Sequence, residues 1–145
     1  MEFILSRVIN SEGVGKLRNH LCRHIIIAIR NLMQQSDIKK DSKDIAAFIG
    51  ISLLEVYKTI DVTVTPWEKR GYWVKADKFR LEWEWTERYA NNLYIALLKD
   101  DWGEVANLFV SIGTKLKKIK PPVRIKRIEY NGSWKRLCRV YTSDG

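Results

Sequence analysis

The stretch from Ile45 to Val56 is apolar on almost every side when it is placed on a helix, and this feature constrains the fold most. A surface helix carries one apolar stripe, whereas a helix that is apolar all round is surrounded by other elements. Gly50 and Ser52 are small residues that allow neighbouring helices to approach closely. We therefore expect a helix at residues 42–63 in the middle of a helical bundle.

The end of this helix is ambiguous in the sequence. Residues 59–65 are rich in β-branched side chains and alternate in character, which also fits a strand. Pro66 disfavours helical geometry at Thr65, so we expect a break or kink there. Residues 59–74 are therefore left open between helix, strand and loop.

Apolar spacings of three and four residues predict two further helices. The first covers residues 16–35, where Leu17, Leu21 and Ile25 begin a helical stripe. The other starts either at Pro66 or near residue 74 and runs to about residue 99. The polar connection at residues 36–41 is short, which favours antiparallel neighbours.

A fourth helix has the clearest start in the chain. Asp101 and Glu104 have the spacing of a capping box, and an apolar stripe continues from there to Pro121-Pro122, which stops the helix. Together these elements predict an all-α, antiparallel four-helix bundle with a short N-terminal arm. We place this bundle domain, including the arm, at residues 1–120.

Residues 121–145 are interpreted as a basic C-terminal extension. Residues 123–130 and 133–141 flank Asn131-Gly132, a strong local signal for the two-residue turn of a β-hairpin. Pairing across this turn would place like charges opposite each other, which is destabilising. We expect a hairpin that is weak alone or steadied by a bound anion.

The positive charge of the chain is concentrated near its end. Residues 115–139 contain ten basic residues and one acid, Glu129, so this segment carries +9, which equals the net charge of the whole chain. Such a concentration is the electrostatic footprint of a polyanion partner. We expect RNA or single-stranded DNA, with Trp134, Tyr130 and Tyr141 offering faces for unpaired bases. The predicted nucleic-acid-binding residues are Lys115, Lys117, Lys118, Lys120, Arg124, Lys126, Arg127, Trp134, Lys135, Arg136 and Arg139.

Two alternatives to nucleic acid are kept for this segment: a solvated tail and a tail that docks on an acidic protein partner. The aromatic-rich residues 67–94 support an interaction module. Trp83 and Trp85 are two residues apart, so on one helix they point about 200° apart and cannot both face one core. We expect one of them at the surface or in a contact between chains of a homo-oligomer.

One pattern in the first helix points to an enzyme. Arg18-Asn19, four further residues and His24 resemble the ribonuclease motif of the HEPN family, whose members are small, all-helical and often dimeric. The resemblance implies that Arg18 stabilises phosphate charge and that His24 acts as a general acid or base. In that family the motif usually lies late in the domain, whereas here it lies on the first helix. Our leading hypothesis is therefore a protein that binds nucleic acid without catalysis, as an accessory subunit of a larger assembly. The interaction module is the second hypothesis, and the ribonuclease is the third.

No cofactor or metal is expected. His20 and His24 have the spacing of two ligands on one helix face, but no Glu-x-x-His motif accompanies them. The apolar runs are shorter than the roughly 20 residues that span a bilayer, and no secretion signal is recognisable at the start. With only two cysteines, Cys22 and Cys138, a disulfide framework is not expected. We therefore expect a cytoplasmic protein without a membrane partner.

Overall fold

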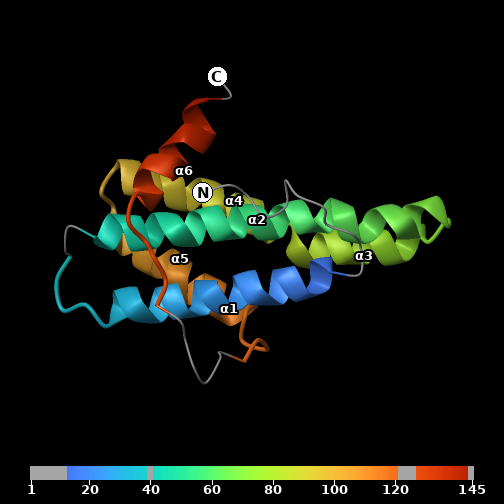
Figure 1. Cartoon of the computed structure of the whole chain (residues 1–145), viewed down its shortest axis with the longest axis horizontal. Coiled ribbons are helices and arrows are strands. Elements are labelled where there is room, and N and C mark those ends of the chain that lie inside the picture. The colour runs from blue at the N-terminus through green and yellow to red at the C-terminus, as the bar shows by residue number, and fades with distance from the viewer. Residues whose placement is uncertain (1–12, 39–40, 121–126, 144–145) are drawn as a thin grey trace.

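The computed structural model describes residues 13–38, 41–120 and 127–143, and within these ranges the regular structure is helical throughout. The all-α class predicted from the sequence is therefore confirmed for this part of the chain. No helix in it is both long enough and apolar enough to cross a membrane. The N-terminal arm lies outside the described residues. In chain order the elements are α1 (Val14–Met33), α2 (Ser42–Lys69), α3 (Trp73–Trp83), α4 (Trp85–Leu98), α5 (Trp102–Lys115) and α6 (Ser133–Thr142) (Figure 1).

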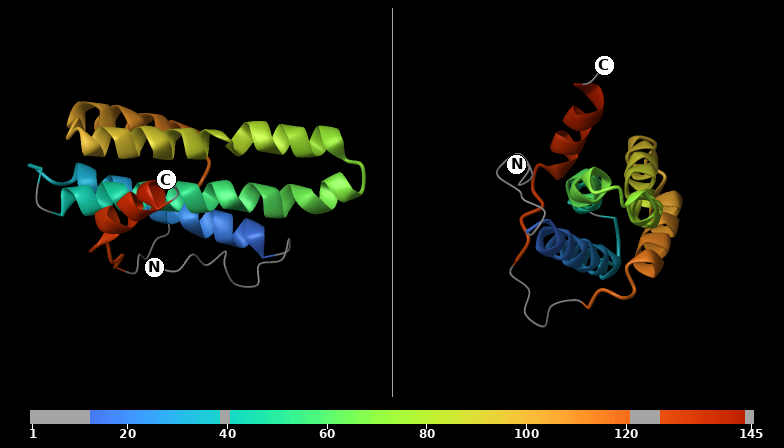
Figure 2. Two further views of the ribbon diagram at one scale, coloured as in Figure 1. Left: turned by 90° about the horizontal axis from the view of Figure 1, so that it is seen from above. Right: turned by 90° about the vertical axis from the view of Figure 1, so that its right-hand side faces the viewer.

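Helix α2 occupies the centre of the fold, the position that its apolar sequence predicted. It contacts α1, α3, α4 and α6, and the right-hand view of Figure 2 shows these elements around it. Ile49, Leu53 and Val56 are fully buried. A Cβ atom added to Gly50 would lie 3.2 Å from a methyl carbon of Leu137, so this glycine allows α6 to approach α2 closely.

The predicted third helix is divided into α3 and α4 at Glu84, so the four helices expected from the sequence correspond to more than four elements in the described part of the chain. The two helices follow each other along one side of α2 (Figure 2). Trp83 and Trp85 stack at 6.4 Å between ring centroids, and Trp85 is buried while Trp83 is half-buried. One of the two was expected at the surface or in a contact between chains; Trp83 keeps part of its surface exposed, and a contact between chains stays a prediction. The expectation that the two rings cannot both face one core was wrong, because Trp83 packs against the buried cluster that contains Trp85.

The sequence predicted a break or kink at Thr65; the break was wrong, because α2 continues through Pro66 to Lys69. Pro66 has no N–H to donate to the carbonyl four residues earlier, so the helix continues with that one hydrogen bond missing. Side-chain packing against α3 also holds this end in place: Ile60 and Val64 form a small buried cluster with residues of α3. Residues 59–69 are therefore helical, and the chain turns at residues 70–72.

The predicted β-hairpin is corrected by α6. Residues 133–142, which include the whole of the predicted second strand at 133–141, form a helix. Residues 127–130 form no strand, and residues 123–126 lie outside the described part. Gly132, at φ +83°, precedes the first helical residue, so the Asn131-Gly132 signal marks a helix start. The side chains of α6 that are buried or half-buried against the bundle recur at helical spacing: Trp134, Leu137, Cys138 and Tyr141. The domain boundary at residue 121 stays a prediction, although α6 packs on α2.

Candidate nucleic-acid interface

The aromatic residues expected to stack on bases are instead used to dock the C-terminal segment on the bundle. The backbone N–H of Trp134 donates to the Asp44 carboxylate at 2.9 Å, and its ring lies 5.8 Å from that of Tyr94. Tyr141 stacks on Tyr94 with ring centroids 4.2 Å apart and donates a hydrogen bond to Asn91. These rings therefore do not form a free platform for a single strand.

Tyr130 is engaged in the same way. Its hydroxyl oxygen accepts a hydrogen bond from the Asn31 side chain at 2.7 Å, and its ring meets Phe48 edge-on at 5.2 Å. Burial raises the pKa of Tyr130, and the bond from Asn31 only partly offsets this effect. Trp134, Tyr130 and Tyr141 are thus half-buried in contacts with the bundle, and their stacking on unpaired bases stays a prediction.

The basic residues of the +9 segment at residues 115–139 separate into two groups. Those at and after the end of α5 are exposed: Lys115, Lys117, Lys118 and Lys120. On α6, Lys135 and Arg139 are exposed, while Arg136 is half-buried and donates to the carbonyl oxygen of Asn131 at 3.1 Å. Arg124 and Lys126 lie outside the described residues.

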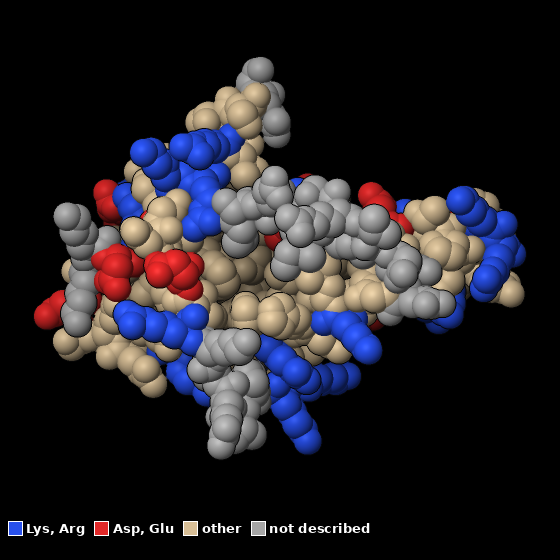
Figure 3. Space-filling view, in the orientation of Figure 1, with Lys and Arg blue, Asp and Glu red and all other residues tan. Residues whose placement is uncertain are grey.

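Acidic residues interrupt the basic surface next to Arg127. This exposed arginine lines a polar groove of about 720 Å³ together with Asp41, Asp44 and Glu129. Figure 3 shows acidic side chains between the basic side chains of α6 and those along α1. The +9 segment is therefore continuous in sequence and divided in space.

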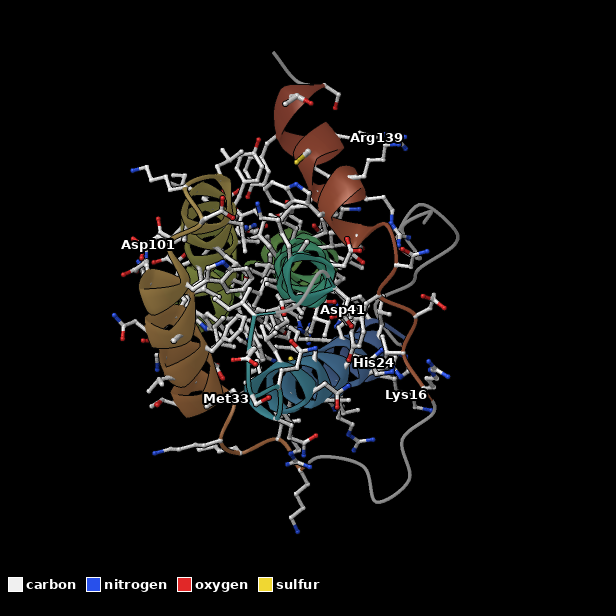
Figure 4. All side chains as sticks on the ribbon, turned by 90° about the vertical axis from the view of Figure 1, so that its left-hand side faces the viewer. Lys16, His24, Met33, Asp41, Asp101 and Arg139 are labelled. Atoms are coloured by element: carbon white, nitrogen blue, oxygen red, sulfur yellow. The ribbon has the colours of Figure 1, made fainter. Side chains whose placement is uncertain are left out.

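The outer face of α1 supplies cations that the sequence reasoning did not assign to the site. Lys16, Arg23 and Arg30 are exposed and spaced by seven residues, which places them on one face at intervals of about 10.5 Å. No Asp or Glu occurs in α1. Figure 4 shows Lys16 and His24 on the same side of the molecule, with Asp41 between them and Arg139 of α6. The seven-residue spacing and the lack of acids were the signals that could have identified this face.

The two histidines lie beside this face. His20 is exposed, His24 is half-buried, and their rings are 4.1 Å apart. Burial lowers the pKa of His24, and the positive charge of a protonated His20 lowers it further. Within the described part of the chain, no group of three or more His, Cys, Asp or Glu residues has an arrangement that could hold a metal ion.

Arg18 serves packing inside the protein. It is 8% exposed, and its Nε donates to Thr59 at 3.1 Å while a terminal nitrogen donates to Thr63. Its guanidinium carbon lies 4.7 Å from the ring centre of Phe79, so this one side chain joins α1, α2 and α3. Burial lowers the pKa of Arg18.

This placement gives no support to a site shared by Arg18 and His24. Six residues on one helix correspond to a separation of about 120° around its axis. Arg18 faces Thr59 and Phe79, whereas the ring of His24 lies 6.4 Å from that of Phe48. The two residues implied by the HEPN resemblance therefore meet different neighbours.

Comparison of the chain with protein-family models, with curated proteins and with solved structures found no match. The functional argument below therefore depends on the geometry of the described residues.

Proposed function

We propose that the protein binds nucleic acid without catalysing a reaction, and that the α1 face makes the main contact with the phosphate backbone. The observation that carries this proposal is the row of exposed cations on α1 (Lys16, Arg23 and Arg30) on a helix that has no acid. The exposed lysines at positions 115, 117, 118 and 120 extend the basic surface at the end of α5. In this proposal α1, α2, α3 with α4, and α5 act as an antiparallel four-helix scaffold, in the cytoplasm.

The spacing of the α1 cations suits a backbone contact. From residue 16 to residue 30 the helix rises by about 21 Å, and duplex DNA carries one negative charge per roughly 1.7 Å of its axis. Each cation can therefore meet a different phosphate. Contacts of this kind carry no base information, so we propose binding that tolerates many sequences. Because the aromatic rings of the extension are occupied, a backbone presented by structured RNA or a duplex fits this face as well as a single strand does.

The proposal is tested with the full chain by fluorescence anisotropy on labelled RNA, single-stranded DNA and duplex DNA at about 50 and 200 mM salt. The variant Lys16→Gln/Arg23→Gln/Arg30→Gln removes only exposed charges. We expect weaker binding to every probe and a salt slope that is smaller by about 2 to 3, since each lost phosphate contact removes about 0.7 to 0.9.

The matched control is Lys135→Gln/Arg139→Gln on α6, whose cations lie beyond the acidic residues of the groove. We expect a smaller loss for this pair. Unchanged affinity and salt slope in the α1 variant would contradict the proposal, and RNA cleavage that disappears in His24→Ala would replace it with the ribonuclease.

An apolar groove favours a second candidate function, self-association. The groove has a volume of about 260 Å³ between the end of α1 and α5, and the exposed side chains of Met33, Ile38 and Val110 line it. Light scattering of the full chain and of Met33→Ser/Val110→Ser separates this candidate from nucleic-acid binding. A defined oligomer that this variant dissociates would support an interaction module.

A further inference from the structure

The turn between α2 and α3 carries an exposed aromatic and aliphatic cluster that no packing inside the described part of the protein explains. We call residues 69–78 the tip. Figures 1 and 2 show that α2 and α3 extend together beyond the other helices and that the tip lies at this end. Tyr72, Trp73 and Val74 are consecutive and 53%, 59% and 71% exposed. Three large side chains in sequence thus face solvent at the far end of the molecule.

The base of this protrusion is firmly held. Trp67 and Phe79 meet edge-on at 5.6 Å between ring centroids. Arg80 on α3 forms ion pairs with Asp61 at 2.7 Å and with Glu68 at 3.2 Å, both on α2. These contacts fix α3 against α2 and leave the tip presented in one orientation, so docking through it needs little further ordering of the backbone.

The tip is also basic. Lys69, Arg70, Lys75 and Lys78 are exposed, and Asp77 is the one acid of residues 69–78. The nearby Glu68 carboxylate is engaged by Arg80, so it does not neutralise the lysines. The tip therefore combines a net positive charge of three with exposed Tyr, Trp and Val side chains.

We propose that the tip docks on an anionic lipid surface, with Trp73, Tyr72 and Val74 in the headgroup layer and the surrounding cations against lipid phosphates. Trp and Tyr favour the interface between membrane and water because their rings are amphipathic. Lys and Arg near an anionic leaflet add electrostatic attraction. This contact is peripheral and requires no spanning helix.

The composition of the tip favours a lipid surface over nucleic acid. Bases would stack on Tyr72 and Trp73, but Val74 and the 69% exposed Leu81 on α3 have no aromatic face to offer them. An acyl boundary accepts aromatic and aliphatic side chains alike. The inference is independent of the proposed function, because the α1 cations and the tip share no residue.

The experiment is sedimentation of the full chain with phosphatidylcholine vesicles that contain or lack phosphatidylserine. We expect binding only to the anionic vesicles. Lys69→Gln/Arg70→Gln/Lys78→Gln should weaken it about 100-fold, since each cation near the surface contributes about 1 kcal/mol. Tyr72→Ser/Trp73→Ser/Val74→Ser should abolish vesicle binding. The substituted side chains are all exposed, so both variants should retain the wild-type circular dichroism spectrum and unfolding midpoint.

Two controls make the test specific. Ile95→Ser on α4 removes an exposed apolar side chain elsewhere and should leave vesicle binding unchanged. The α1 variant Lys16→Gln/Arg23→Gln/Arg30→Gln should lose RNA affinity but keep most of the vesicle binding. Vesicle binding that survives both tip variants, or that depends on α1 alone, overturns the proposal. Loss of RNA affinity in the tip variants with unchanged vesicle binding would assign the tip to nucleic acid.

Discussion

Glu55 makes the stability of this protein depend on pH in a direction that can be predicted. The residue lies on the central helix α2 and is 3% exposed, and its Oε1 has no hydrogen-bond partner in the described part of the structure. Burial raises the pKa of Glu55 from 4.5 to about 7, and the positive charge of Lys58 only partly opposes this effect. Folding at neutral pH therefore either desolvates a carboxylate or retains a proton on it.

The sign and size of the effect follow from this pKa. Below about pH 4.5 the carboxyl is protonated in both folded and unfolded chains, so it has no pH-dependent effect on stability. Between about pH 4.5 and about pH 7 the unfolded chain has released the proton while the folded chain still holds it, so the free energy of unfolding falls across this range and levels off above about pH 7. At 1.36 kcal/mol per pKa unit, the full loss is about 3 kcal/mol.

The perturbation is Glu55→Gln, which keeps the shape of the side chain and removes its titration. Urea unfolding of both proteins from about pH 4.5 to about pH 8 gives the difference in free energy of unfolding at each pH. We expect this difference to change by about 3 kcal/mol in favour of the variant as the pH rises. His24, whose pKa is lowered by burial, acts in the opposite direction, but it is present in both proteins and cancels in the difference.

Glu84→Gln is the matched control, because Glu84 is exposed between α3 and α4. It makes the same chemical change at a site where no carboxyl is buried. A flat difference for Glu55→Gln would refute the reasoning, and so would a difference that shifts in favour of the wild type as the pH rises, because that sign means that the folded protein stabilises the charged carboxylate.

Two further predictions concern packing and are tested by urea unfolding. Arg18→Met should lower the free energy of unfolding by about 2 to 4 kcal/mol, because Thr59 and Thr63 lose a charged hydrogen-bond donor that the Met thioether does not replace. A loss below about 0.5 kcal/mol would show that the hydrogen bonds of Arg18 to these threonines are not maintained in solution. Leu137→Ala should lower it by about 2 to 5 kcal/mol, since this fully buried side chain fills the space beside Gly50; a change near zero would mean that α6 does not dock in solution.

The central helix and the start of α5 were predictable because their signals are local. The apolar run at residues 45–56 predicts only that other elements surround this helix, and α2 is surrounded by α1, α3, α4 and α6. Asp101 accepts a hydrogen bond from the backbone N–H of Glu104 at 3.1 Å, as its capping position predicted. In both cases the evidence lies within a few turns of chain and does not depend on which distant element packs there.

The errors arose where distant contacts decide between local alternatives. Periodicity places Trp83 and Trp85 on opposite sides of one helix, but both pack on the same buried cluster and their rings stack, and neither Gly nor Pro marks the end of α3 between them. Asn131-Gly132 is compatible with a hairpin and with a helix start. The pocket beside Gly50, which Leu137 of α6 fills, belongs to a helix more than 80 residues earlier in the chain.

The candidate site shows that a count of charges along the sequence cannot tell which cations lie on one face of the protein. A count along the chain identifies the +9 segment, where cations are dense. It overlooks α1, where six residues separate each of Lys16, Arg23 and Arg30 from the next while the helix brings them onto one face. On the same helix Arg18 is turned inward, so charge alone does not mark a binding residue. Only the position around the helix distinguishes a cation that meets solvent from one that supports the core.

This distinction decides how the binding hypothesis is best tested. A chain shortened to end before residue 115 would remove all cations of the extension, but it would also remove Leu137 from its place beside Gly50 and Tyr141 from its stack on Tyr94. Exposing that part of the core would destabilise the bundle by several kcal/mol, so lost binding would report unfolding as readily as lost contacts. Substitutions of exposed cations on α1 and α6 leave this packing intact. The difference between those two sets of variants therefore assigns binding to one face, which the shortened chain does not do.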